Sequence, residues 1–187
     1  MTDTHTTNTR RGFSLRDMAL CSLFAAILAV SAWLTIPGEV PFTLQTFGVF
    51  AALGLLGGKR GTIALALYLI LGAVGLPVFA GFRGGFGVLL GTTGGYIFGF
   101  LLSGLLYWAL TSALGQRAWT RLLAMVAGLL LCYAAGTAWF MLVYLRQTGP
   151  IALSAVLLKC VVPFLLPDAV KLGIAWILSQ RLARFVP

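Results

Sequence analysis

Residues 18–36 read MALCSLFAAILAVSAWLTI, an apolar run without a single charged side chain. A run of this length is enough for one helix to cross the hydrocarbon core of a bilayer, which takes about 20 residues. Further apolar runs cover residues 46–57, 61–76, 91–113, 122–145 and 151–184. The sequence therefore predicts an all-α membrane protein with six transmembrane helices in one domain, residues 18–187, behind a flexible cytoplasmic tail over residues 1–17.

The composition excludes several other classes of protein. Of the 187 residues, 60% are hydrophobic and only 9% are charged, whereas a soluble domain has about a quarter charged residues. A soluble enzyme, a disordered protein and a disulfide scaffold are all excluded. Cys21, Cys132 and Cys160 lie singly in apolar runs, so we expect them to be packing residues rather than metal ligands or redox partners. The polar start of the chain predicts no cleaved signal peptide.

The net charge of +9 does not indicate a nucleic-acid partner, because the basic residues lie between apolar runs rather than in one patch. This pattern is typical of cytoplasmic loops that face anionic membrane lipid. With a cytoplasmic amino terminus, the outside holds only Arg83 and Arg146. The inside holds nine basic residues: Arg10, Arg11, Arg16, Lys59, Arg60, Arg117, Arg121, Arg181 and Arg184. This asymmetry predicts six spans with both termini in the cytoplasm.

Two irregular segments interrupt the helical pattern on the predicted outer side. Residues 37–46 contain Pro37 and Pro41, and residues 77–87 contain four glycines around Arg83. Non-helical backbone at membrane depth is tolerated only where protein or a water-filled cavity satisfies it. We therefore expect both segments to fold over or into a ligand cavity that opens outward.

One acidic residue lies within a predicted span, Asp168, and Lys171 follows three positions later. Side chains at this spacing share a helix face, and charges inside a membrane mark a functional site by default. Pro167 suits the first turn of a helix, which would place the carboxylate near the positive end of the helix dipole. The face would offer one acceptor and one donor to a polar ligand. The alternative is an ion pair that only makes both charges tolerable.

Other polar or flexible residues could complete such a site. Gly91-Thr92-Thr93-Gly94-Gly95-Tyr96 opens a predicted helix, where glycines would let a ligand approach the backbone, although helix packing is the better explanation of this segment taken alone. Thr43 and Gln45 would share one side of an extended segment and face either a ligand or water.

Small residues recur at helical spacing on three predicted helices, as close helix packing in membranes requires. For Gly95/Gly99/Ser103 and Gly128/Cys132/Gly136 we expect packing within the protein. On the first helix the set is Ser22, Ala25, Ala29 and Ala32. There, docking of a partner protein through Ala25 and Ala29 is as good an interpretation as internal packing.

The sequence lacks the residues that the common types of enzymatic catalysis require. The only histidine is His5 in the tail, and the spans contain no pair of acids, which disfavours nucleophilic, metal-dependent and two-carboxylate catalysis. Gly57-Gly58-Lys59-Arg60 lacks both the first glycine and the Ser or Thr of a phosphate-binding loop. We expect neither an enzyme nor a cofactor nor a metal. A purely structural adaptor is disfavoured by the irregular outer segments, which have no use without a ligand.

Four segments, in this order, resemble the BioY family of biotin-specific substrate-binding components of energy-coupling-factor (ECF) transporters. They are Val40–Gly48 (VPFTLQTFG), Gly72–Gly81 (GAVGLPVFAG), Gly91–Tyr96 (GTTGGY) and Pro167–Lys171 (PDAVK). The resemblance implies a six-helix protein of the bacterial cytoplasmic (inner) membrane that captures biotin from outside, with the loop after the first helix as a lid. It also implies ATPase subunits and a transmembrane coupling protein as partners, the latter docking on the alanine stripe.

The resemblance places Tyr96, Asp168 and Lys171 in the vitamin site. The ureido N–H groups of biotin would donate to Asp168, and its carboxylate would meet Lys171 or Tyr96. Thr43, Gln45, Gly94, Gly95 and Arg83 complete the expected substrate-binding set. Two departures stand out: Thr92 replaces a frequent proline, and the asparagine that can serve the ureido group is missing, since the only asparagine is Asn8. A backbone group, Gln45 or a water would have to replace it. Another small vitamin, or transport without dedicated ATPase subunits, remains an alternative.

Overall fold

The computed structural model describes residues 13–38 and 40–182. Residues 1–12, with His5 and Asn8, lie outside the described residues, as do Glu39 and residues 183–187. The predicted tail over residues 1–17 is too long at its inner end, because α1 already begins at Leu15. Ser14 caps this helix: its hydroxyl accepts from the Asp17 backbone N–H at 3.2 Å, and the Asp17 carboxylate accepts from the Ser14 N–H at 3.0 Å.

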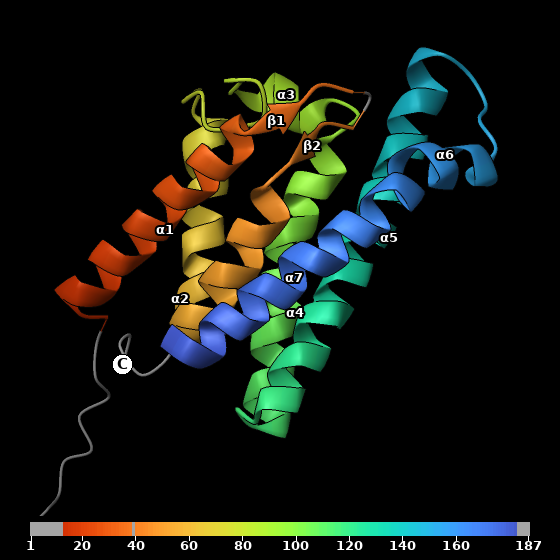
Figure 1. The fold of residues 1–187 in the computed structure, drawn as a ribbon. Helices are drawn as coiled ribbons and strands as arrows, with labels where there is room; N and C mark the ends of the chain where they lie inside the picture. Colours follow the sequence, from red (N-terminus) through yellow and green to blue (C-terminus); the bar gives the residue numbers. More distant parts are fainter. Residues whose placement is uncertain (1–12, 39, 183–187) are drawn as a thin grey trace, which may run out of the picture.

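The described residues form helices apart from one short β-hairpin, in the order shown in Figure 1. The hairpin pairs β1 (Thr35–Ile36) with β2 (Phe42–Thr43) in antiparallel fashion. The helices are α1 (Leu15–Trp33), α2 (Gln45–Ala73), α3 (Phe86–Leu90), α4 (Gly94–Leu114), α5 (Ala118–Gln147), α6 (Leu153–Cys160) and α7 (Val162–Leu182). Five of them, α1, α2, α4, α5 and α7, are long and apolar enough to cross a membrane. The chain is a multi-pass membrane protein.

Helix α2 consists of two halves that reverse direction at Gly57. The backbone there has φ 79° and ψ 172°, which only glycine adopts readily. The halves then pack side by side, since a Cβ atom at Gly61 would lie 2.9 Å from the Leu53 Cα. In Figure 1 the orange first half runs beside the yellow second half. The two separate runs expected over residues 46–57 and 61–76 thus correspond to one helix broken at a single glycine.

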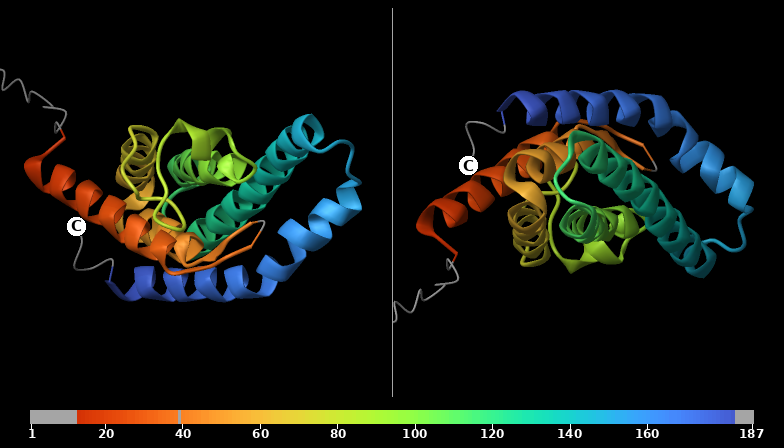
Figure 2. Two further views of the ribbon diagram at one scale, coloured as in Figure 1. Left: turned by 90° about the horizontal axis from the view of Figure 1, so that it is seen from above. Right: turned by 90° about the horizontal axis from the view of Figure 1, so that it is seen from below.

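Helices α4 and α5 pack through the small residues that the sequence indicated. A Cβ atom at Gly99 would lie 2.8 Å from the Cys132 sulfur, and one at Gly128 would lie 3.2 Å from the Ser103 Cβ. The Ser103 hydroxyl also donates to the Gly128 carbonyl at 2.6 Å. The predicted internal packing of these two stripes is confirmed. Figure 2 shows α4 between α5 and the second half of α2.

The alanine stripe of α1 faces the core, so the expected docking face at Ala25 and Ala29 is not at the surface. Their exposed fractions are 2% and 5%. Helix α1 lies against α2, where Gly48 allows close approach: a Cβ atom there would lie 3.2 Å from the Leu28 Cδ2. Small side chains on both helices are therefore used for internal contact. The neighbouring Ala26 is exposed on the opposite face.

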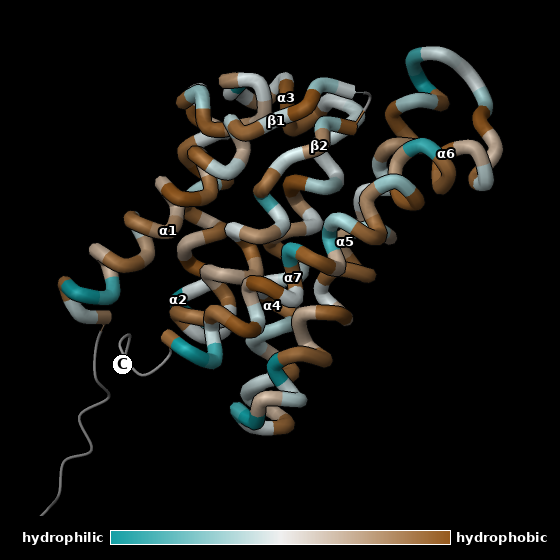
Figure 3. Tube along the Cα trace, in the orientation of Figure 1, coloured by the Kyte–Doolittle hydropathy of each residue, from teal (hydrophilic) through white to brown (hydrophobic). Residues whose placement is uncertain are grey.

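The two ends of the bundle differ in charge. The start of α1, the Gly57 turn, the α4–α5 connection and the end of α7 lie at one end, and the hairpin, α3 and the α5–α6 connection lie at the other (Figure 1). Hydropathy along the chain shows hydrophilic residues near these ends and mostly apolar residues between them, with hydrophilic exceptions on α7 (Figure 3). Six of the nine basic residues predicted to be inside are described, and all belong to the first end: Arg16, Lys59, Arg60, Arg117, Arg121 and Arg181. Arg10, Arg11 and Arg184 lie outside the described residues.

Side-chain contacts hold this basic end together. Arg60 pairs with Asp17 of α1, with 2.7 Å between Nε and Oδ1. Arg121 of α5 donates to the Gly54 carbonyl, just before the Gly57 turn, and to the Tyr107 hydroxyl at 3.3 Å. Three helices are therefore fixed to the reversal of α2.

The last apolar region breaks at a place other than its prolines. The backbone leaves helical geometry at Val161 (φ −126°, ψ −56°), and α7 begins at Val162. Pro163 occupies the first turn, which tolerates proline because its missing N–H has no helical partner there. Pro167 lies inside the helix, so the prediction that Asp168 belongs to the first turn is wrong. The other irregular segment also contains structure: Phe79 and Arg83 form a β-bridge and α3 follows.

Candidate functional site

A cavity of about 710 Å³, measured with its open mouth, lies under the β-hairpin between α4, α5 and α7. Its walls are mostly apolar, with Val40 of the hairpin connection, Ile97 and Phe100 of α4, and Leu129 of α5 among them. Thr43, Gln45, Arg83, Tyr96, Asp168 and Lys171, all expected from the sequence, also line it. A largely apolar cavity with a few convergent polar groups is typical of small-molecule sites.

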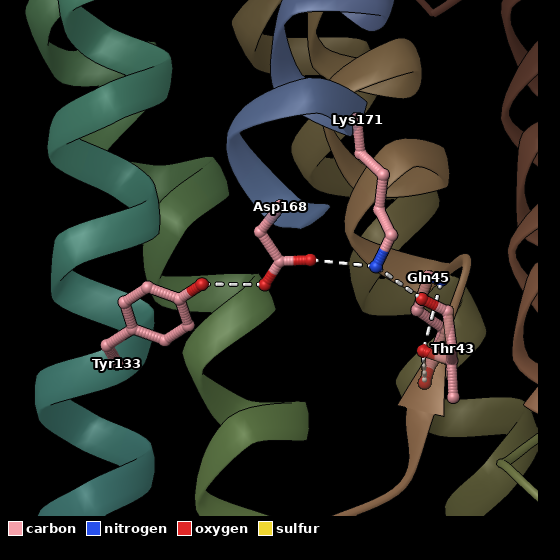
Figure 4. A network of polar contacts seen from close by, with 5 residues as sticks. All are labelled: Thr43, Gln45, Tyr133, Asp168 and Lys171. Atoms are coloured by element: carbon pink, nitrogen blue, oxygen red, sulfur yellow. Dashed lines mark hydrogen bonds and ion pairs between the residues drawn. The ribbon is translucent and has the colours of Figure 1, made fainter. Parts of the chain in front are cut away.

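Asp168 and Lys171 form an ion pair in the cavity wall, with 2.8 Å between Nζ and Oδ1. Their exposed fractions are only 3% and 7%. Buried charges need both pairing and further hydrogen bonds. The second carboxylate oxygen of Asp168 accepts from the Tyr133 hydroxyl of α5 at 2.7 Å. Figure 4 shows this chain of contacts. The two charges do pair, as the alternative interpretation of the sequence held, but the pair is part of a larger polar network.

Lys171 connects α7 to the hairpin. Its ammonium donates to the Thr43 carbonyl at 2.7 Å and lies 4.2 Å from the centre of the Phe42 ring, a cation–π distance. The same ring stacks on Phe164 of α7, with 5.8 Å between centroids. The end of the hairpin is therefore held against α7 by one charged and one aromatic contact.

Thr43 and Gln45 line the cavity but do not form one extended segment, because Gln45 is the first residue of α2. The Thr43 hydroxyl accepts from the Gln45 backbone N–H at 3.2 Å and is 3.3 Å from its side-chain oxygen. The Gln45 amide nitrogen donates to the Tyr68 hydroxyl at 2.6 Å, which in turn donates to the Val78 carbonyl at 3.1 Å. This network fixes the Gln45 amide and leaves its second N–H hydrogen for another acceptor.

Tyr96 and Arg83 occupy other parts of the wall. The Tyr96 ring is buried, and its hydroxyl lies 3.5 Å from the Cys160 carbonyl. Arg83 belongs to the loop before α3 and is exposed, with its Nε donating to the Ala80 carbonyl at 3.3 Å. Within residues 13–38 and 40–182, no carboxylate forms an ion pair with Arg83. The cavity thus has a neutral ion pair in its wall and, elsewhere, a cation that pairs with no carboxylate of the described residues.

Gly94 and Gly95 serve helix packing rather than the cavity. A Cβ atom at Gly94 would lie 1.8 Å from the Leu89 carbonyl oxygen, and one at Gly95 would lie 2.1 Å from the Trp139 Cβ. Neither belongs to the described cavity lining, where Thr93 and Tyr96 represent this segment. Their contacts instead set how α4 approaches α3 and α5.

Sequence reasoning missed Tyr133, Phe42 and Phe164. Tyr133 stands one position after Cys132 in a stripe interpreted as packing, and a tyrosine in an apolar run is not distinctive. One feature of the sequence could have pointed to Tyr133: a buried Asp168 needs a hydrogen-bond donor besides Lys171. That need points to hydroxyl groups on facing helices, but the sequence does not specify which one. No group of three or more His, Cys, Asp or Glu residues gathers as a metal site in the described part of the chain.

Comparisons with known proteins agree on one family. The model of the BioY family matches residues 4–187. A biotin transporter BioY of Thermotoga maritima is 43% identical over 171 residues, which are 91% of this chain and 97% of that protein. A probable biotin transporter BioY of Pyrococcus horikoshii is 39% identical, over 89% of this chain and 96% of that protein. The crystal structure of the S-component for biotin from an ECF-type ABC transporter aligns with a TM-score of 0.79 and 28% identity, over 90% of this chain and 91% of that one.

Proposed function

Because the chain belongs to the BioY family, we propose that it captures biotin from outside the cell with high affinity and carries it across the cytoplasmic membrane as the substrate-binding component of an ECF transporter. The observation that carries the proposal is the buried Asp168–Lys171–Tyr133 network in the wall of a largely apolar cavity. A bicyclic ligand with a polar ureido edge and an aliphatic tail has the same distribution of polar and apolar surface.

The network suggests how the ligand lies. Each Asp168 oxygen already accepts one hydrogen bond and has capacity for another, so the carboxylate receives the ureido N–H groups. The second amide hydrogen of Gln45 serves the ureido oxygen in place of the missing asparagine. Apolar walls from Tyr96 and Phe164 cover the fused rings. The ligand carboxylate then reaches Arg83, whose guanidinium has no carboxylate partner among the described residues.

In the membrane, the proposal has six crossings, with the two halves of α2 as the second and third. Both termini lie in the cytoplasm, and the hairpin end of the bundle faces outward. The distribution of basic residues supports this orientation: Lys59 and Arg60 at the Gly57 turn lie at the same end as Arg117, Arg121 and Arg181. The ligand cavity then opens on the outer face.

Energy would come from a transmembrane coupling protein with ATPase subunits. Gly57–Arg60 forms the reversal of α2, not the strand-to-helix loop that binds nucleotide phosphates. Uptake of labelled biotin by cells that lack biotin synthesis, with and without coexpressed coupling subunits, tests this part. Equal uptake in both strains would establish the solitary alternative.

Equilibrium binding of labelled biotin to the purified chain in detergent tests the core of the proposal. We expect saturable binding that unlabelled biotin displaces and that thiamine or riboflavin does not. The Asp168→Asn variant should bind at least about tenfold more weakly, because a hydrogen bond to a buried charge is worth about 1.5–3 kcal/mol. Arg181→Gln, on the exposed end of the same helix, is the matched control. Absence of saturable biotin binding, together with saturable binding of another labelled vitamin to the same protein, would overturn the proposal in favour of a different substrate.

A further inference from the structure

A second space lies beside the ligand cavity. It is a groove of about 650 Å³, measured with the open space at its mouth, between α5 and the α6 region, and its lining includes the apolar residues Ala134, Ala138, Met141 and Leu157. Tyr133 is the one described residue that lines both the cavity and the groove. The two spaces are therefore separated at this position by a single side chain.

Tyr133 is held in place from the cavity side. Its hydroxyl donates to Asp168 at 2.7 Å, and its exposed fraction is 8%. On the groove side, the neighbouring lining residues Ala134 and Ala138 are small and leave space next to the helix. The hydrogen bond to α7 therefore fixes the tip of a ring that has open space on its other side.

Apart from Tyr133 and Thr137, the groove is lined by apolar side chains. The Thr137 hydroxyl, in a residue only 6% exposed, makes no hydrogen bond of normal geometry with the described residues, but it lies close enough to the Tyr96 hydroxyl to interact with it. The groove is thus suited to an apolar group.

We propose that Tyr133 sets the size limit for the ring end of the ligand, by closing the cavity against this groove. The inference deepens the proposed function and rests on it. A ureido group on Asp168 lies next to the Tyr133 hydroxyl, so an alkyl substituent on the adjacent ureido nitrogen would need the space that the ring occupies. Tyr133 therefore excludes N-alkylated ureido ligands, and the groove would accept their alkyl group if the ring were absent.

Binding of biotin and of N1′-methylbiotin tests whether Tyr133 closes the cavity against the groove. Wild-type protein should prefer biotin by at least about tenfold, since one methylene-sized group in a pocket is worth about 10- to 200-fold. Tyr133→Ala should reduce the ratio of the affinities for biotin and N1′-methylbiotin at least about tenfold. Tyr133→Leu should do the same and replaces the alanine variant if that variant fails to fold. Tyr133→Phe keeps the ring, so it should weaken both ligands together and keep their ratio. Tyr144→Ala, another tyrosine of α5 that lines neither space, is the control.

A second readout needs no ligand. With Cys21 and Cys132 replaced by serine, Cys160 reports on the cavity, which it lines while only 1% exposed. Tyr133→Ala should raise the rate of its modification by N-ethylmaleimide several-fold, and Tyr133→Phe should not. The proposed role of Tyr133 would be overturned if folded Tyr133→Ala or Tyr133→Leu protein showed an unchanged ratio of the two affinities together with an unchanged rate of Cys160 modification. A different outcome is that wild-type protein fails to bind biotin while Tyr133→Ala still raises the rate of Cys160 modification. That outcome would contradict biotin as the substrate and leave the role of Tyr133 between the cavity and the groove intact.

Discussion

The Lys171 ammonium donates to the Thr43 carbonyl at 2.7 Å and so joins residues that are 128 positions apart in the chain. The same ammonium neutralises Asp168. One side chain thereby connects closure of the hairpin over the cavity with the charge balance inside it. Loss of Lys171 should disturb both at once.

We expect Lys171→Met to lower both biotin affinity and thermal stability, because it leaves Asp168 as a buried anion. Breaking a buried pair costs about 3–5 kcal/mol, whereas replacing both partners by apolar or neutral groups is often tolerated. The double variant Asp168→Asn/Lys171→Met should therefore unfold at a higher temperature than Lys171→Met while still failing to bind biotin. Thermal unfolding in detergent and binding assays measure the two effects. Additive losses of stability would show that the two side chains are not coupled.

Gly136 supports Tyr96 from behind. A Cβ atom at Gly136 would lie 2.2 Å from the Tyr96 Cδ1, so Gly136→Ala must move the ring toward the cavity or separate α4 from α5. Overpacking of this kind costs about 1–3 kcal/mol. We expect biotin affinity to fall about tenfold without any change in a charged group. Gly173→Ala on α7, where a Cβ atom meets nothing within 4 Å, should leave affinity unchanged.

The Gly57 reversal requires glycine for its backbone and not for space. Nothing lies within 4 Å of a Cβ atom there, yet φ is +79°. Gly57→Ala should therefore lower the free energy of unfolding by about 1–3 kcal/mol. Gly173→Ala, in ordinary helical geometry, should raise it by about 0.5–1 kcal/mol. If thermal unfolding shows the same shift for both variants, the reversal at Gly57 does not hold the backbone as described.

The alanine stripe of α1 can be tested by a pair of neighbouring variants. Ala25→Trp inserts a large ring at a position that is 2% exposed and should prevent stable folding or lower the unfolding temperature sharply. Ala26→Trp lies on the exposed face and should fold normally. Size-exclusion profiles and thermal unfolding in detergent compare them. A well-folded Ala25→Trp protein that binds biotin but no longer supports uptake would restore the docking interpretation.

Much of the fold follows from sequence patterns because membrane helices leave strong ones. The apolar runs, the small-residue stripes of α4 and α5, and the grouping of basic residues all rest on local spacing. Asp168 and Lys171 could be singled out since charges are rare inside a span. Their three-residue spacing also predicts that they share a face.

Features that depend on contacts between distant segments could not be predicted. Whether the alanines of α1 face inward depends on where α2 lies, and α2 lies there because the chain reverses at Gly57. The break at Val161 rather than at Pro167 similarly reflects the packing of α6 and α7 and not proline alone. Tyr133 gains its role only from Asp168, which lies 35 positions away.

The reversal at Gly57 also affects the lipid around the protein. The two halves of α2, residues 45–56 and 58–73, are about 18 and 24 Å long at about 1.5 Å per residue, whereas the hydrocarbon core is about 30 Å thick. Ile70 of the second half is 56% exposed, so acyl chains meet a helix too short for them. In the proposed topology with six crossings, we expect the bilayer to thin on this side of the molecule, at a cost of a fraction of a kcal/mol per ångström of mismatch. Lipids with shorter tails should therefore gather along α2.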